Sequence, residues 1–135
     1  MRFQRSYLVV LMMAVSSVSC TGYDTFPKER TKGLDEPATL KALIDGGQTV
    51  GDGEYRIVDV RPVEKYAKGH IPTAMNLPNG NLDNGVTPPP KDKFIIVYCE
   101  TGGRAQMAAK KMAKAGYNHI YNWGGFGNWS FEAEK

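Results

Sequence analysis

Cys99 and Arg104 bound a six-residue segment whose residue types can do chemistry on an anion, Cys99-Glu100-Thr101-Gly102-Gly103-Arg104. The apolar run at 94–98 predicts a buried strand before it, and residues 105–115 predict a helix after it. A cysteine at such a junction faces backbone N–H groups and the positive end of the helix dipole. This position favours the thiolate, which is the attacking form of the side chain. From these residues alone, the alternative is a small buried cysteine before an ordinary turn.

Alternating strand and helix patterns predict the elements that position this segment. They indicate an α/β fold with a mainly parallel sheet flanked by helices. Ligands of such sheets bind at the carboxyl ends of the strands, where Asp59 and Cys99 both fall. The predicted helices are 35–46 (with Asp35 as cap), 62–68 and 105–115, where Met107 and Met112 are assigned to the core. The predicted strands are 55–60, 74–78, 94–98 and 117–121; residues 79–92 form a loop and 124–129 a closing turn.

Composition narrows the partners of the chain. The 17 Lys and Arg residues barely exceed the 14 Asp and Glu residues, and they form no long basic run. A nucleic-acid partner is therefore not expected. The His, Cys, Asp and Glu residues do not have metal-ligand spacing, so we predict neither a metal site nor another cofactor.

The N-terminal residues predict export. Residues 1–19 combine two arginines, a short apolar core and small residues, which is typical of a signal peptide. Cys20 follows directly and resembles the acylated cysteine of bacterial lipoproteins; plain cleavage before Cys20 is the alternative. We expect residues 20–33 to be a flexible tether and 34–135 to be the folded domain. The expected location is the bacterial cell envelope, as a lipid-anchored protein or as a soluble periplasmic or secreted one. Acylation of Cys20 would leave Cys99 as the sole free thiol of an exported protein, which makes a structural role for Cys99 less expected.

Two motifs carry a family resemblance. Ile57-Val58-Asp59-Val60-Arg61, Glu64-Lys65-Tyr66 and the run from Gly69 to Pro78 closely resemble the first rhodanese motif. The run from Tyr98 to Arg104, together with Ala108-Ala109, Gly116-Tyr117 and the run from Gly124 to Trp129, resembles the second rhodanese motif. Together they cover about residues 34–129. The chain departs from the family at Thr73, where glycine is usual, and at Ala105, where a serine hydroxyl at the rim of the site is common.

The resemblance implies a three-layer rhodanese-like domain and a sulfurtransferase. Cys99 would take a sulfane sulfur from a donor such as thiosulfate, hold it as a persulfide, and pass it to cyanide or a thiol. Residues 100–104 would form the persulfide loop, and Asp59 and Arg61 would support it. Four residues separate Cys99 from Arg104, whereas five separate the cysteine from the arginine in related phosphatases and arsenate reductases. Phosphatase or arsenate reductase activity is therefore disfavoured. The alternative function is a non-catalytic sulfur carrier or redox sensor that acts with a partner protein.

Several side chains keep two interpretations at this stage. Arg104 lies near the site or forms an ion pair with Asp59, and the two roles are compatible. Arg61 helps to bind the donor or pairs at the surface. Glu100 tunes the site away from small anions such as thiosulfate, or it simply points to solvent. His70 is assigned to fixing a turn rather than to catalysis.

Overall fold

The structure, a computed structural model, describes residues 31–83 and 85–135. The predicted signal peptide, the acylation of Cys20 and most of the predicted tether lie outside these residues. Within the described ranges, no helix has both the length and the apolar character needed to cross a membrane.

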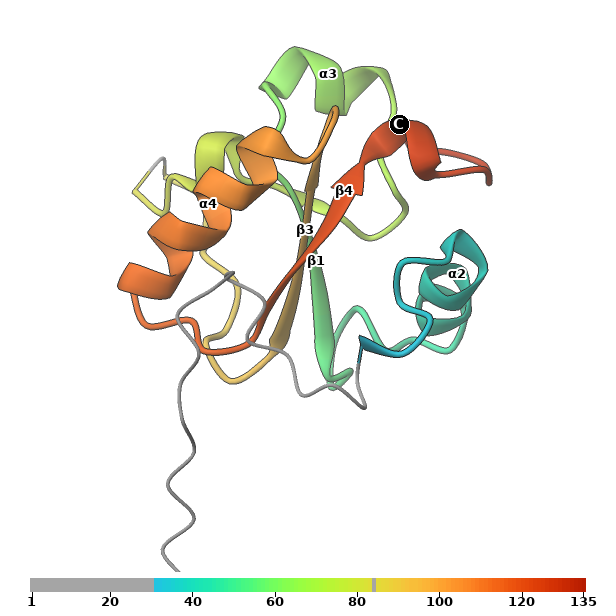
Figure 1. Cartoon of the computed structure of the whole chain (residues 1–135), viewed down its shortest axis with the longest axis horizontal. Coiled ribbons are helices and arrows are strands. Elements are labelled where there is room, and N and C mark those ends of the chain that lie inside the picture. The colour runs from blue at the N-terminus through green and yellow to red at the C-terminus, as the bar shows by residue number, and fades with distance from the viewer. Residues whose placement is uncertain (1–30, 84) are drawn as a thin grey trace, which may run out of the picture.

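A four-stranded parallel sheet forms the centre of the domain, in the order β2 (Met75–Asn76), β1 (Tyr55–Asp59), β3 (Phe94–Cys99) and β4 (Ile120–Gly125). Helix α4 (Gly103–Lys114) covers one face of this sheet and α2 (Pro37–Asp45) lies on the other, while α3 (Val63–Lys68) lies beyond the carboxyl ends of the strands (Figure 1). The 3₁₀ turns are η1 (Pro78–Gly80) and η2 (Phe126–Asn128). The predicted three-layer α/β architecture is confirmed.

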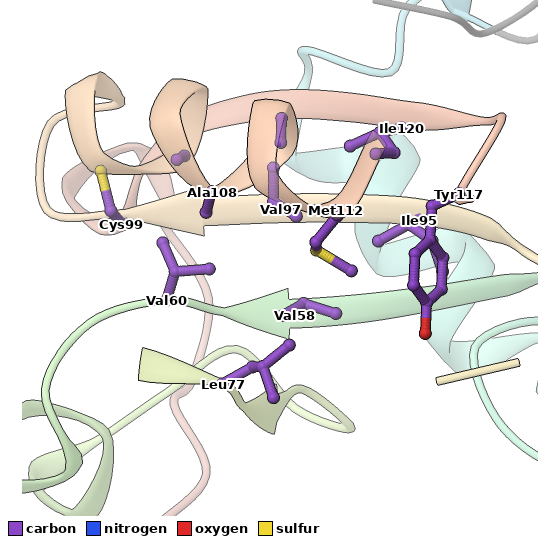
Figure 2. Packing of buried hydrophobic residues seen from close by; sticks show 12 residues of the cluster. Val58, Val60, Leu77, Ile95, Val97, Cys99, Ala108, Met112, Tyr117 and Ile120 are labelled. Atoms are coloured by element: carbon purple, nitrogen blue, oxygen red, sulfur yellow. The ribbon is translucent and has the colours of Figure 1, made fainter. Parts of the chain in front are cut away.

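Strand β3 is buried on both faces, as expected for a central parallel strand. Because successive side chains point to opposite faces, Ile95, Val97 and Cys99 join the hydrophobic cluster under α4 (Figure 2). Ile96 and Tyr98 join the second cluster, on the other face. This alternation directs the Cys99 side chain to the face of the sheet that carries α4.

The last strand was predicted too early and too short. Tyr117 is not part of it: its N–H donates to Met112 O and closes the end of α4. Strand β4 instead starts at Ile120 and runs through Gly124 and Gly125, which had been assigned to a turn. An irregularity in the β3–β4 register at Val97/Tyr98 accommodates this extension.

Two helix predictions also need correction. Glu36, not Asp35, occupies the N-cap position of α2, and its side chain makes no capping hydrogen bond. Met107 is 72% exposed and not in the core. The buried face of α4 is formed instead by Met112 and small alanines, which let the helix lie close to the sheet: Ala105, Ala108 and Ala109.

Candidate active site

The Cys99 sulfur lies at the junction of β3 and α4. Cys99 is only 1% exposed, and the Gly102 N–H donates a hydrogen bond to Sγ over 2.8 Å. Gly102 adopts a left-handed conformation (φ 99°), which suits a residue without a Cβ. The next residue, Gly103, begins α4, so the positive end of the helix dipole also lies here. The local geometry therefore stabilises negative charge on the sulfur.

Strand β4 supports this loop from the side. The Asn122 side chain donates to Gly102 O (3.0 Å) and accepts from the Gly124 N–H (2.9 Å). Gly125 pairs with Cys99 in the sheet register, and a Cβ at position 125 would lie 2.3 Å from Glu100 O. The loop thus needs both an amide and a bare glycine on β4. Sequence reasoning missed Asn122; its signal was its place two residues before the glycine pair at 124 and 125.

Asp59 pairs with Arg61 rather than Arg104. Arg61 Nη2 lies 2.7 Å from Asp59 Oδ2, and the Arg61 N–H donates to Oδ1 over 2.9 Å. Both side chains are buried, so the interpretation of Arg61 as half of a surface pair was wrong. The alternative interpretation of Arg104, an ion pair with Asp59, was also wrong. The reason is local, because Arg61 follows Asp59 by two residues and reaches it within one turn. Burial opposes the Arg61 charge, but the hydrogen bond and charge of Asp59 outweigh it and raise the pKa of the guanidinium.

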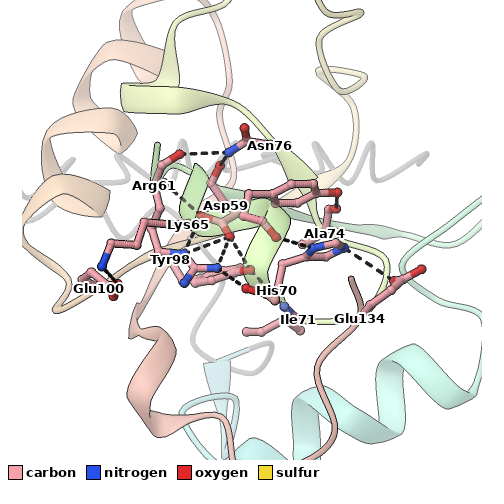
Figure 3. A network of polar contacts seen from close by, with 12 residues as sticks. Asp59, Arg61, Lys65, His70, Ile71, Ala74, Asn76, Tyr98, Glu100 and Glu134 are labelled. Atoms are coloured by element: carbon pink, nitrogen blue, oxygen red, sulfur yellow. Dashed lines mark hydrogen bonds and ion pairs between the residues drawn. The ribbon is translucent and has the colours of Figure 1, made fainter. Parts of the chain in front are cut away.

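This pair belongs to a polar network that holds the turn at residues 69–71 (Figure 3). Tyr98 Oη donates to Asp59 Oδ2 over 2.8 Å and accepts from the Ile71 N–H over 3.0 Å. Burial and the Asp59 charge raise the pKa of Tyr98 far above its ordinary value, so the phenol stays a neutral donor. Arg61 also donates to Gly69 O over 2.7 Å. Tyr98, the residue before Cys99, therefore connects the first motif to the second.

His70 lies in that turn, as the sequence predicted. Its Nδ1 is 3.0 Å from Tyr66 O, and its ring stacks on the Tyr66 ring at 3.7 Å between centroids. Its backbone pairs with Glu134 in an antiparallel bridge. Burial, followed by the charges of Glu134 and Asp59, raises the pKa of Tyr66. These contacts indicate a structural role for His70, in which it holds the turn against Tyr66 and Glu134.

A pocket of about 420 Å³ opens over the cysteine. It brings together five residues predicted for the site and two that were not: Arg61, Cys99, Glu100, Thr101 and Arg104, with Pro62 and Lys65. Gly102 and Gly103 supply the loop backbone, and Asp59 lies behind Arg61. Lys65 was part of the quoted motif, but no role had been inferred for it. The pocket is called the sulfur pocket below.

The charges that line the sulfur pocket differ in their partners. Arg61 is neutralised by Asp59, and Lys65 Nζ lies 3.4 Å from Glu100 Oε1. Arg104 is exposed, and its guanidinium has no hydrogen-bond or ion-pair partner among residues 31–83 and 85–135. Arg104 is therefore a cation available to an incoming anion. Together with the N–H donor at Gly102, it suits attack by a thiolate on an anionic compound.

Two further expectations concern the rim of the sulfur pocket. The Glu100 side chain is 45% exposed, so it does reach solvent, yet it also lines the pocket and pairs with Lys65. Ala105 is fully buried in the core cluster under α4 and does not line the pocket. The expectation that Ala105 removes a hydroxyl from the rim was wrong, because the first turn of α4 directs this side chain to the sheet.

Comparison with known proteins is consistent with this geometry. The thiosulfate sulfurtransferase GlpE of Shewanella oneidensis is 35% identical over 75 residues, which cover 55% of this chain and 74% of GlpE. The "Putative sulfur carrier protein YrkF" of Bacillus subtilis is 34% identical over 71 residues, which cover 53% of this chain and 38% of YrkF. The chain thus spans well under half the length of YrkF.

Solved structures show the same fold. A rhodanese with anions from E. coli superposes with a TM-score of 0.53 at 28% identity, over 60% of this chain and 98% of that one. The rhodanese-like domain of the Anabaena protein Alr3790 superposes with a TM-score of 0.61 at 27% identity, over 73% of this chain and 76% of that one. The family model of the rhodanese-like domain matches residues 36–132, and this chain therefore belongs to the rhodanese-like domain family.

Proposed function

We propose that this protein is a sulfurtransferase that carries a sulfane sulfur as a persulfide on Cys99. The observation that carries the proposal is the hydrogen bond from the Gly102 N–H to Cys99 Sγ, at the base of the sulfur pocket, which is also lined by Arg104, a cation without a partner among the described residues. Family membership and the sulfurtransferase and sulfur-carrier names of the relatives support it. Asp59 and Arg61 are assigned a supporting role, because they anchor the turn behind the pocket.

In the first half-reaction, thiosulfate is the proposed donor. The Cys99 thiolate attacks the outer sulfur, and a bond forms between Sγ and that sulfur. The S–S bond of thiosulfate breaks, and its electron pair leaves on sulfite. Arg104 attracts the anion, and the backbone N–H groups of the loop hold the charge of the resulting persulfide.

In the second half-reaction, the outer sulfur passes to a nucleophile, either cyanide or a thiol. The electron pair of the Cys99 S–S bond returns to Sγ, which regenerates the thiolate. A sulfur carrier that delivers to a partner protein is the second candidate. The Lys65–Glu100 pair favours it, because this pair places a carboxylate at the pocket, where it opposes doubly charged thiosulfate.

The proposed location is the bacterial cell envelope, with the chain held at the membrane by a lipid on Cys20 or released after cleavage before Cys20. The composition of residues 1–20 supports this proposal. The intact mass of protein taken from its host tests it. An acyl mass on Cys20 supports anchoring, and an uncleaved, unmodified N-terminus contradicts export.

Substitution of the two cysteines tests the function. Cys99→Ser should abolish both the gain of one sulfur atom in the intact mass after thiosulfate treatment and the transfer of sulfur to cyanide. Cys20→Ser is the matched control and should retain both. Transfer that survives in Cys99→Ser would rule out Cys99 as the carrier. A wild-type protein that loads sulfur but discharges it only to a protein partner would favour the sulfur carrier.

A further inference from the structure

A second pocket, of about 290 Å³, adjoins the sulfur pocket and shares Arg104 with it. We call it the side pocket; it is lined by Asn79, Asn81, Arg104, Met107 and Lys111. None of these residues except Arg104 has a place in the sulfur chemistry described above. A ligand that occupies the side pocket would therefore contact an arginine that also faces the reacting sulfur.

The side pocket is built by one face of α4 and the turn η1. Arg104, Met107 and Lys111 are spaced by three and four residues, so they lie along one side of the helix. The opposite wall depends on Gly80, where a Cβ would lie 2.9 Å from the Ala108 Cβ. This close approach holds the two flanking asparagines beside the helix. The close packing of η1 against α4 thus fixes the two walls of the side pocket relative to each other, and mostly exposed side chains of both elements line it.

Its lining is cationic and, among the described residues, contains no carboxylate. Arg104 has no partner within the described part of the chain, and Lys111 Nζ donates to the neutral amide oxygen of Asn81 over 2.7 Å. Neither positive charge is therefore cancelled by these contacts. Between them, Met107 is 72% exposed and offers a flexible apolar surface. A carboxylate attached to a short apolar or amide-containing body fits this combination.

We propose that the side pocket binds the organic part of the sulfur acceptor, and that this acceptor is a low-molecular-weight thiol carrying a carboxylate. This inference rests on the proposed function. A small acceptor is favoured because Cys99 is almost completely buried, so the incoming thiol has to enter the sulfur pocket. Lys111 binds the carboxylate, Met107 contacts the body of the acceptor, and Arg104 lies between the two pockets.

The transfer step is balanced without a further reactant. The acceptor thiolate attacks the outer sulfur of the Cys99 persulfide, and a new S–S bond forms in the acceptor. The old S–S bond breaks, and its electron pair remains on Cys99 Sγ. The products are the acceptor persulfide and the Cys99 thiolate. Charge is conserved, because one thiolate replaces another.

Binding of a non-reacting analogue tests the side pocket without any sulfur transfer. S-methylglutathione keeps two carboxylates but has no free thiol, and its diethyl ester has neither carboxylate free. We expect S-methylglutathione to shift the NMR signal of the Met107 methyl group in the purified protein, and the diester to bind at least about tenfold more weakly. Lys111→Ala should weaken binding of S-methylglutathione by about tenfold, which is the loss expected for one charge-assisted hydrogen bond.

Lys114→Ala is the matched control, because Lys114 lies on the same helix, is exposed and does not line the side pocket. It should bind S-methylglutathione as the wild type does. The inference is overturned if the Met107 signal does not move, if the ester binds as tightly as the acid, or if both lysine variants weaken binding equally. Failure of the proposed function is seen separately, as absence of sulfur on Cys99 in the loading experiment.

Discussion

Asp59 and Arg61 form a buried ion pair at the carboxyl end of β1, with 2.7 Å between Oδ2 and Nη2. The same guanidinium donates to Gly69 O, and the same carboxylate accepts from Tyr98 Oη. One charge pair therefore links β1, the turn after α3 and the residue before Cys99. It also leaves the Arg104 guanidinium without a carboxylate partner among the described residues.

Replacement of Asp59 by Asn tests how much this ion pair contributes to the free energy of unfolding. Asp59→Asn keeps the shape of the side chain but leaves Arg61 charged and buried without its counter-ion. Removal of one partner from a buried pair is strongly destabilising, so we expect the free energy of unfolding to fall by about 3 kcal/mol. Urea unfolding measures this change. Asp45→Asn, which breaks the exposed Lys41–Asp45 pair, is the control and should cost about 0.5 kcal/mol or less. Equal costs for the two variants would contradict the role given to Asp59.

The sequence predicted the central architecture because β1 and β3 are runs of apolar and β-branched residues, separated by helical patterns. It did not predict the extent of β4. Glycines at 124 and 125 are typical of a turn, and only the approach of the Glu100 carbonyl to Gly125 explains their place in a strand. Such a requirement arises from tertiary packing and leaves no local pattern.

The partner of Asp59 was within reach of sequence reasoning. Residues two apart in an extended segment point to the same side, so the spacing of Asp59 and Arg61 already favoured contact. The exposure of Met107 could not be predicted from the sequence, because an amphipathic pattern of small alanines and methionines does not fix which methionine faces the sheet. The side pocket was also beyond prediction, because it depends on the contact between Gly80 and Ala108.

Thr73 occupies a left-handed conformation (φ 71°), in which a β-branched residue is strained. Its hydroxyl lies 2.7 Å from the Thr49 hydroxyl, so every truncation loses that contact equally. We therefore expect Thr73→Gly to be more stable than Thr73→Ala by about 1 kcal/mol, since only glycine relieves the backbone strain. Thermal and urea unfolding of the two variants measure this. At Gly127, where the structure shows no positive φ and a Cβ meets no atom within 4 Å, the order should reverse and alanine should be the more stable residue.

Glu100 should set the response of the sulfur pocket to thiosulfate. Its carboxylate repels the donor and also engages Lys65. Glu100→Gln removes the repulsion and frees the lysine charge, so the second-order rate constant for loading of Cys99 should rise by about fivefold at low salt. The gain should shrink as salt is added, because these charges are exposed. Glu36→Gln carries the same charge change at the start of α2 and should leave loading unchanged. An unchanged rate in Glu100→Gln would mean that Glu100 does not act on the donor.

Gly125 should matter more for the position of the sulfur than for the fold. A methyl group there would lie 2.3 Å from Glu100 O, so Gly125→Ala must push the loop away from β4. Misplacement of a reacting group by about 1 Å costs on the order of 100-fold in rate, and we expect a loss of that size in the loading of Cys99 from thiosulfate. Overpacking should lower the free energy of unfolding by about 1–3 kcal/mol. Gly127→Ala, two residues on and in open space, should preserve loading. If Gly125→Ala loads sulfur as fast as Gly127→Ala, the support of the loop by β4 is not needed for the chemistry.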